Sequence, residues 1–127
     1  MDKVVHFEIP FEDKEKAMTF YKEVFGWELM DMPEMNYVIA HTSETDEFNM
    51  LKEAGSINGG MFKRSEQLKN PVIVINVDNI DESVEKIKGN GGNVLREKVQ
   101  VGDMGFIAYA KDTEGNVIGI WENLKKG

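Results

Sequence analysis

The sequence contains no cysteine. This absence excludes disulfide bonds, thiolate metal sites and thiol nucleophiles, because each of them needs a cysteine sulfur. A chain of 127 residues does not need such a covalent staple, since a domain of this size can bury roughly two thirds of its unfolded surface. We therefore expect a single domain, and a location in the reducing environment of the cytoplasm.

Long apolar runs and an excess of positive charge are also missing. No stretch approaches the roughly 20 apolar residues of a membrane span, and no long apolar segment follows the lysine of the N-terminus. Lysine and arginine number 15 against 23 aspartates and glutamates, so the formal charge is −8. Phosphate backbones and anionic membranes are repelled by such a chain. We expect a soluble protein with neither nucleic acid nor membrane as a partner.

The first half of the chain has the pattern of one strand, one helix and three strands. Residues 3–9 alternate as a strand does, and residues 12–27 then take a helical period. Asp13 suits the N-cap of that helix and Gly26 suits its end. The predicted apolar stripe of the helix consists of Ala17, Tyr21, Val24 and Phe25. Three further strands are predicted over residues 27–32, 36–43 and 56–62.

The second half repeats this plan. Residues 71–77 are rich in β-branched side chains, which predicts a strand buried on both faces. The helix predicted over residues 79–92 places Ile80, Val84 and Ile87 on one face. Strands are then predicted over residues 93–99, 105–111 and 116–123, with a tight turn at DTEG between the last two.

An alignment of the chain with itself supports an internal repeat. His6 falls on Val72, Tyr21 on Ile87 and Gly26 on Gly92, so strand, helix and glycine stop keep the same register in both halves. The repeat is one of pattern, because few residues are identical. We predict an α+β fold made of two βαβββ modules, at about residues 1–65 and 66–127, with curved mixed sheets around a central cleft and the helices outside.

Three segments carry a resemblance to a known family. They are HFEIPFEDKEKAMTFYKEVFGWEL, VINVDNIDESVEKIKGNGGNV and the closing KDTEGNVIGIWEN. In combination they resemble the vicinal oxygen chelate superfamily, which includes glyoxalases (lactoylglutathione lyases), bleomycin-resistance proteins and extradiol dioxygenases. The resemblance covers nearly the whole chain, and it implies two modules around a shared site and a homodimer. Exposed edges of an open sheet also favour a homodimer, because a second copy can cover them.

In metal-using members of this superfamily, the first and the last strand of each module each supply one ligand. The resemblance places these positions at His6, at Val72, at Gly119 and within the NGGM segment, where Asn58 is the best donor. Only His6 is a strong ligand, and one neutral imidazole holds a divalent ion poorly. We therefore predict no metal at this site and no other cofactor, although a divalent metal stays possible.

His6 and Glu8 lie two residues apart on the first strand, so they project from the same face, opposite Val5, Phe7 and Ile9. We expect the three apolar residues to meet the helices and the polar pair to line the cleft. A carboxylate near an imidazole can tune a general base. The same pair can also be a hydrogen-bonded lining without chemistry.

The remaining predicted ligand-binding residues form an apolar wall with a polar end. They are Asn58, Val72, Val74, Asn76 and Trp121. Trp121 can stack a planar ligand, or it can be a core or dimer contact. Glu122 projects from the face opposite Gly119 and Trp121, so we interpret it as a solvated carboxylate at a strand end.

Three functions remain open from the sequence. The first is a protein that resembles the bleomycin-resistance proteins and binds a small, partly apolar organic molecule without the usual metal. The second is a metal-dependent lyase, isomerase or dioxygenase that rests on His6. The third is a metal-free acid/base enzyme that uses His6 and Glu8 as tentative catalytic residues.

Overall fold

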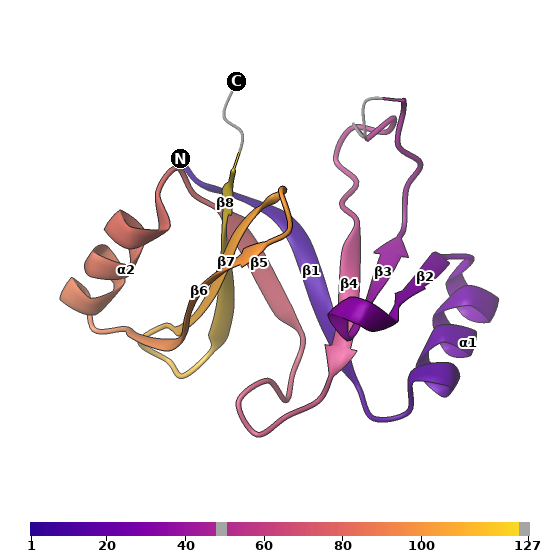
Figure 1. Cartoon of the computed structure of the whole chain (residues 1–127), viewed down its shortest axis with the longest axis horizontal. Coiled ribbons are helices and arrows are strands. Elements are labelled where there is room, and N and C mark those ends of the chain that lie inside the picture. Colours follow the sequence, from indigo (N-terminus) through magenta and orange to yellow (C-terminus); the bar gives the residue numbers. More distant parts are fainter. Residues whose placement is uncertain (48–50, 125–127) are drawn as a thin grey trace. The chain divides into compact units, whose positions relative to one another are not determined.

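The computed structural model describes residues 1–47 and 51–124. Over these residues the chain forms two α-helices and eight β-strands, which confirms the predicted α+β class (Figure 1). The chain divides into two compact units. The first unit is His6–Pro71, and the second combines Met1–Val5 with the chain from Val72 onward. The predicted module boundary at residues 65 and 66 therefore falls a few residues before the end of the first unit.

The first unit contains a helix packed on four strands. Its strand order is β2-β3-β4-β1, in which only the β1–β4 pair is parallel. The elements are β1 (Lys3–Phe11), α1 (Lys14–Phe25), β2 (Glu28–Met32), the 3₁₀ turn η1 (Pro33–Met35), β3 (Tyr37–His41) and β4 (Gly59–Lys63).

Helix α1 begins and ends where the sequence predicts. The Asp13 side chain accepts a hydrogen bond from the backbone N–H of Lys16, and Gly26 ends the helix in the left-handed conformation with φ 73°. Its buried stripe differs from the prediction, because Val24 and Phe25 are more than half exposed. The helix packs through Ala17, Met18 and Tyr21 against the core residues Phe11, Val38 and Met61.

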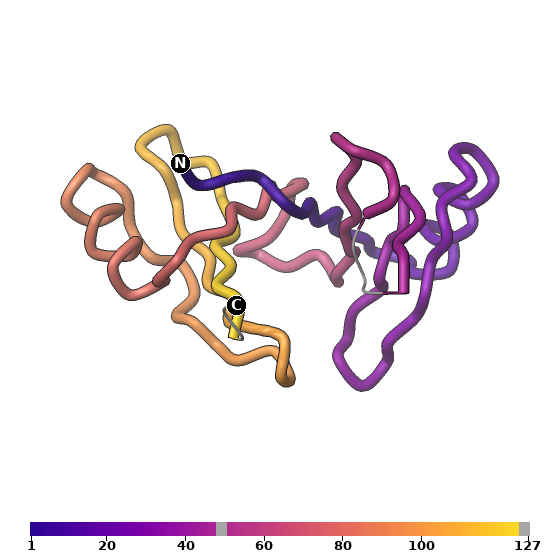
Figure 2. Tube along the Cα trace, turned by 90° about the horizontal axis from the view of Figure 1, so that it is seen from above, coloured from indigo at the N-terminus to yellow at the C-terminus, as the bar shows by residue number. Residues whose placement is uncertain are grey.

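The second unit repeats the arrangement with strand order β5-β8-β7-β6, in which β5 and β8 are parallel. Figure 2 shows the N-terminal residues running beside the strands of this unit. The elements are β5 (Val72–Asn76), α2 (Ile80–Gly89), β6 (Asn93–Val101), β7 (Gly105–Lys111) and β8 (Val117–Asn123).

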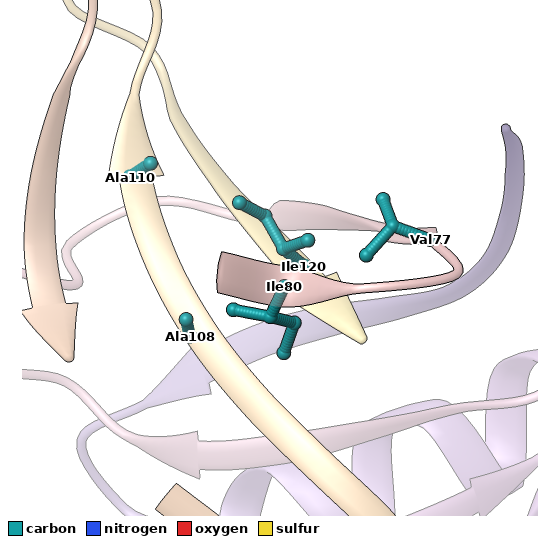
Figure 3. Packing of buried hydrophobic residues seen from close by; sticks show 5 residues of the cluster. All are labelled: Val77, Ile80, Ala108, Ala110 and Ile120. Carbon is teal, nitrogen blue, oxygen red and sulfur yellow. The ribbon is translucent and has the colours of Figure 1, made fainter. Parts of the chain in front are cut away.

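The core of the second unit lies between α2 and its strands. Ile80 is fully buried, and Val84 and Ile87 pack beside it, as the helical period predicts. Figure 3 shows the cluster of Val77, Ile80, Ala108, Ala110 and Ile120. Strand β5 differs from the prediction of burial on both faces, since Ile73 is 49% exposed between two buried valines.

The turn between β7 and β8 is held by one carboxylate. Oδ1 of Asp112 accepts hydrogen bonds from the backbone N–H groups of Glu114 and Asn116. These bonds, the one from Asn116 first, lower the pKa of Asp112 below its ordinary value.

In the described part of the chain, neither helix has the length and apolar character needed to cross a membrane.

Candidate functional site

A hydrogen-bonded chain of three polar side chains lies on one face of the first unit, and of these Glu8 is buried while His6 and Tyr37 are partly buried. The hydroxyl of Tyr37 donates a hydrogen bond to Oε2 of Glu8 at 2.7 Å and lies 2.9 Å from Nε2 of His6. Both partners come from β1, and Tyr37 comes from β3. The predicted common face of His6 and Glu8 is confirmed, because one hydroxyl reaches both side chains.

The strand register brings the three groups together across a glycine. Glu8 on β1 and Ile39 on β3 both pair with Gly60 on the intervening strand β4. Tyr37 is two residues from Ile39 and so projects from the same face. A Cβ atom at Gly60 would overlap the hydroxyl and ring of Tyr37. The missing side chain of Gly60 therefore makes the space that the tyrosine ring fills.

Burial affects the charge state of His6 in this hydrogen-bonded chain. Glu8 is 5% exposed and is the only buried charged residue in the described part of the chain. Burial lowers the pKa of His6 below its ordinary value of 6.5, because desolvation penalises the charged imidazolium. His6 is therefore a neutral imidazole at neutral pH, able to donate through one ring nitrogen and accept through the other.

Sequence reasoning missed Tyr37. Its position at the start of a predicted strand was visible, but a single sequence does not reveal which strand lies beside β1. The signal that bore on it was Gly60, a glycine inside a strand pattern, since such a glycine often marks the close approach of another group.

The apolar residues predicted to line the site gather in the second unit. Val72 and Val74 on β5 are each 2% exposed, and Val74 pairs with Gly119 on β8. A Cβ atom at Gly119 would lie 3.0 Å from Cγ2 of Val74 and 3.6 Å from Cγ1 of Val72. Cε1 of Tyr109 would lie at 3.5 Å, so two valine methyl groups and a tyrosine ring surround the position of Gly119.

Asn76 and Trp121, at the polar end of this predicted wall, form hydrogen bonds within the second unit. Nδ2 of Asn76 donates to the carbonyl oxygen of Trp121 at 3.0 Å, and Nε1 of Trp121 donates to Oδ1 of Asn123 at 2.8 Å. Trp121 is partly exposed. A role for either residue in binding a ligand stays a prediction.

Asn58 forms hydrogen bonds within the first unit. Its side-chain oxygen accepts hydrogen bonds from the backbone N–H groups of Thr42 at 2.8 Å and Ser43 at 3.0 Å. These bonds tie the segment after β3 to the start of β4. The predicted contact between Asn58 and a ligand stays a prediction.

Glu122 differs from the solvated carboxylate that the sequence predicts. It is partly buried, and its Oε1 accepts a hydrogen bond from the backbone N–H of Ile80 at 2.8 Å. Ile80 is the first residue of α2, whose N–H has no partner within the helix. Glu122 therefore joins β8 to the N-terminus of α2, on the face opposite Gly119 as predicted.

The residues at the family's ligand positions do not fit a divalent metal. Val72 has no donor atom and Gly119 has no side chain. On β4, Gly60 has no side chain, and Tyr37 of β3 fills the space beside it. Nε2 of His6 already faces the Tyr37 hydroxyl. Over residues 1–47 and 51–124, no three histidine, cysteine, aspartate or glutamate side chains gather into a group that could hold an ion.

A separate cavity of about 450 Å³ lies elsewhere in the first unit, lined by Phe11, Lys14, Pro33, Asn36 and Lys63. It includes none of the predicted site residues. Its lysines are engaged, since Lys14 forms an ion pair with Asp31 at 3.0 Å and Lys63 donates to the carbonyl oxygen of Glu12.

Comparison with known proteins finds a matching family and relatives that cover nearly the whole chain. Residues 3–43 match the family described as bleomycin resistance protein-like N-terminal. The chain is 30% identical to a lactoylglutathione lyase of Escherichia coli O157:H7, with 98% of this chain and 96% of the relative covered. A lactoylglutathione lyase of Haemophilus influenzae is 29% identical, over 95% of this chain and 93% of its own length.

Solved structures share the fold at low sequence identity. A hypothetical protein from Bacillus halodurans C-125 superposes with a TM-score of 0.64 at 18% identity, covering 99% of this chain and 97% of that one. The methylmalonyl-CoA epimerase of Mycobacterium tuberculosis superposes with a TM-score of 0.59 at 14% identity, covering 94% of this chain and 87% of that one. The strand and helix order, the β-strand registers and these relatives agree, and the chain belongs to the vicinal oxygen chelate superfamily, among the glyoxalase and bleomycin-resistance-like proteins.

Proposed function

We propose that this chain binds a small, partly apolar organic molecule and does so without a divalent metal ion. One observation carries the proposal. Where the resemblance places metal ligands, this chain has a hydrocarbon side chain at Val72 and none at Gly119. Within NGGM, the Asn58 oxygen already accepts two backbone hydrogen bonds, and a tyrosine ring lies over Gly60. The imidazole of His6, the one strong ligand that remains, forms a hydrogen bond with that tyrosine, Tyr37. Recognition must then depend on shape and hydrogen bonds.

The described residues offer both kinds of contact. The His6–Tyr37–Glu8 chain supplies fixed polar groups, because each member is held by the next. The partly exposed ring of Trp121 is the proposed apolar contact. Val72 and Val74 are each 2% exposed, and a contact between them and a ligand stays a prediction. Polar groups of a ligand suit the first kind of contact, and planar or aliphatic groups suit the second.

Titration calorimetry with Ni²⁺ and Zn²⁺ tests the metal-free part of the proposal. We expect no one-to-one binding to the wild-type protein, and the same result for His6→Gln. The matched control is His41→Gln, which removes the other histidine of the chain. Tight stoichiometric binding that disappears in His6→Gln and persists in His41→Gln contradicts the proposal and favours the metal-dependent alternative.

Thermal unfolding in the presence of a panel of small aromatic and heterocyclic compounds tests the binding part. A true ligand raises the melting temperature, because binding to the folded state stabilises it by about 2.7 kcal/mol at one hundred times Kd. Stabilisation that is lost in Trp121→Ala, with no change in the compound over time, supports a binding protein. A panel hit that is converted to product contradicts a purely binding role.

The second candidate function is metal-free acid/base catalysis, and the bonding of His6 to Glu8 through Tyr37 favours it. A neutral imidazole can take a proton from an acidic C–H bond of a bound molecule. Incubation of panel hits in D₂O tests this function by NMR. Exchange of a carbon-bound proton that is lost in His6→Gln supports catalysis, and the absence of any exchange rejects it for those compounds.

We also propose that two copies of the chain associate, as the sequence analysis expects. Strands β2 and β6 end the strand order, and Val99 on β6 is 58% exposed. Unpaired sheet edges with apolar side chains are surfaces that a second copy can cover. The cytoplasmic location predicted from the sequence stays a prediction.

A further inference from the structure

We propose that Tyr37 is a positioning residue that holds His6 in the tautomer with its proton on Nε2, so that Nδ1 is the acceptor that a ligand meets. The assignment of the tautomer stands on the first unit alone. Only the statement about the ligand rests on the proposed function.

The count of protons at the Tyr37 hydroxyl carries the assignment. A phenol has a single proton to donate, and here that proton is directed at Oε2 of Glu8 at 2.7 Å. The second contact, from the same oxygen to Nε2 of His6 at 2.9 Å, then needs a proton from the imidazole. Because burial keeps His6 neutral, its single ring proton is on Nε2 and Nδ1 retains its lone pair.

Tyr37 is held in place from several sides. Its ring lies over Gly60, where any side chain would collide with it. On the N-terminal side, the backbone N–H of Asn36 bonds to the carbonyl oxygen of Pro33, and Asn36 has the left-handed φ of 51°. This turn sets the point at which Tyr37 enters β3. The hydroxyl is thus pre-positioned, and the tautomer of His6 follows from it.

The assignment predicts the kind of group that His6 recognises. A bare Nδ1 accepts a hydrogen bond and does not donate one. A ligand should therefore present an N–H or O–H group, such as an alcohol, an amide or a protonated amine, to His6.

In the catalytic alternative, Nδ1 takes the proton of the bound molecule and the ring becomes an imidazolium. Its Nε2 proton can then pass to the Tyr37 oxygen while the phenol proton passes to Glu8. After this transfer the imidazole is neutral again and Glu8 carries the added proton.

Long-range ¹H–¹⁵N NMR of the imidazole tests the proposal without any ligand. The His41→Gln background leaves His6 as the single imidazole of the chain. Spectra at about pH 8 observe the neutral ring, since an unperturbed histidine titrates near 6.5. We expect Nε2 to carry the proton, Nδ1 to have the shift of an unprotonated ring nitrogen, and the Nε2 proton to exchange slowly with water.

Three variants test whether Tyr37 determines the tautomer of His6. Tyr37→Phe should give a mixture of tautomers and loss of the slowly exchanging Nε2 proton. Gly60→Ala should weaken the same signal while the hydroxyl is retained, because the added Cβ displaces the tyrosine ring. Tyr21→Phe is the matched control, since it removes a hydroxyl from a tyrosine that stacks on Trp27 with ring centroids 4.8 Å apart. It should leave the His6 signals unchanged.

The outcomes separate this inference from the proposed function. A proton on Nδ1 in the otherwise wild-type protein overturns the assignment, because Glu8 must then carry the proton donated to Tyr37. An Nε2 proton that is equally protected in Tyr37→Phe overturns the positioning role. Neither result depends on a ligand or a metal. Failure to find a ligand would in turn leave the NMR result intact.

Discussion

At the scale of single residues, the strand period predicted the shared face of His6 and Glu8, and the structure confirms it. Alternation along a strand is a local property, so the sequence carries it. The third member, Tyr37, depends on β3 and β1 lying on either side of β4. That arrangement is not local, and no pattern within one strand reveals it.

Protonation of His6 should destabilise the fold. Burial lowers the pKa of His6 in the folded state below the ordinary value of 6.5. The stability contributed by the neutral ring is therefore complete above about pH 6.5 and is lost as the pH falls through the lowered folded-state pKa. Urea unfolding measured from pH 8 to pH 5 should show this loss in the wild-type protein.

The control for this prediction is the removal of each histidine in turn. His6→Gln should reduce the loss of stability at low pH, whereas His41→Gln keeps His6 and should retain the wild-type pH dependence. Identical pH dependences of wild type and His6→Gln would contradict the proposed effect of burial.

At the scale of elements, the caps predicted α1 well and the helical period predicted the packed face of α2. The predicted glycine stop of α2 at Gly92 is wrong, since the helix ends at Gly89 with Asn90 as its C-cap. Asp13 and Gly26 bound α1, and Ile80, Val84 and Ile87 pack from α2 as expected. Which side chains of α1 are buried was less predictable. Met18 packs and Val24 is exposed, since the contact depends on where the helix lies on its strands.

Glu122 should stabilise the start of α2 through its bond to the N–H of Ile80. Glu122→Ala leaves this N–H without its acceptor, and we expect the free energy of unfolding to fall by about 1–3 kcal/mol. Glu122→Gln keeps an acceptor oxygen and should cost less, the difference reporting the interaction of the charge with the helix N-terminus. Chemical denaturation measures both values.

Glu114→Ala is the matched control, because Glu114 is an exposed glutamate in the turn before β8. Its effect should stay within about 0.5 kcal/mol. Equal effects of the two alanine substitutions would mean that Glu122 is no more than the surface carboxylate that the sequence suggested.

At the scale of the whole molecule, the pattern of two βαβββ modules predicted the α+β fold, and the relatives confirm the superfamily. The exposed fractions of Val99 and Ile73 were not predictable, because they depend on which strands end a sheet and what lies on each face. The exposed side chain of Val99 supports the proposal that two copies of the chain associate.

The proposed association of two copies has a direct test. Light scattering after size-exclusion chromatography should give twice the mass of one chain. Val99→Lys places a charge on the edge strand β6 and should shift the protein towards the mass of a single chain, since charged side chains protect sheet edges from pairing. Asn70→Lys, at an exposed position in the segment before β5, controls for added charge alone. A wild-type protein with the mass of one chain contradicts the association.

The sequence by itself determined the elements, their order and the lack of donor atoms at Val72 and Gly119. These features follow from local periodicity and from the chemistry of each residue type. The tertiary structure alone decided that Tyr37 lies between His6 and Glu8, and that Glu122 accepts the first N–H of α2. Both contacts join residues far apart in the chain, and strand pairing and helix packing determine which of them meet.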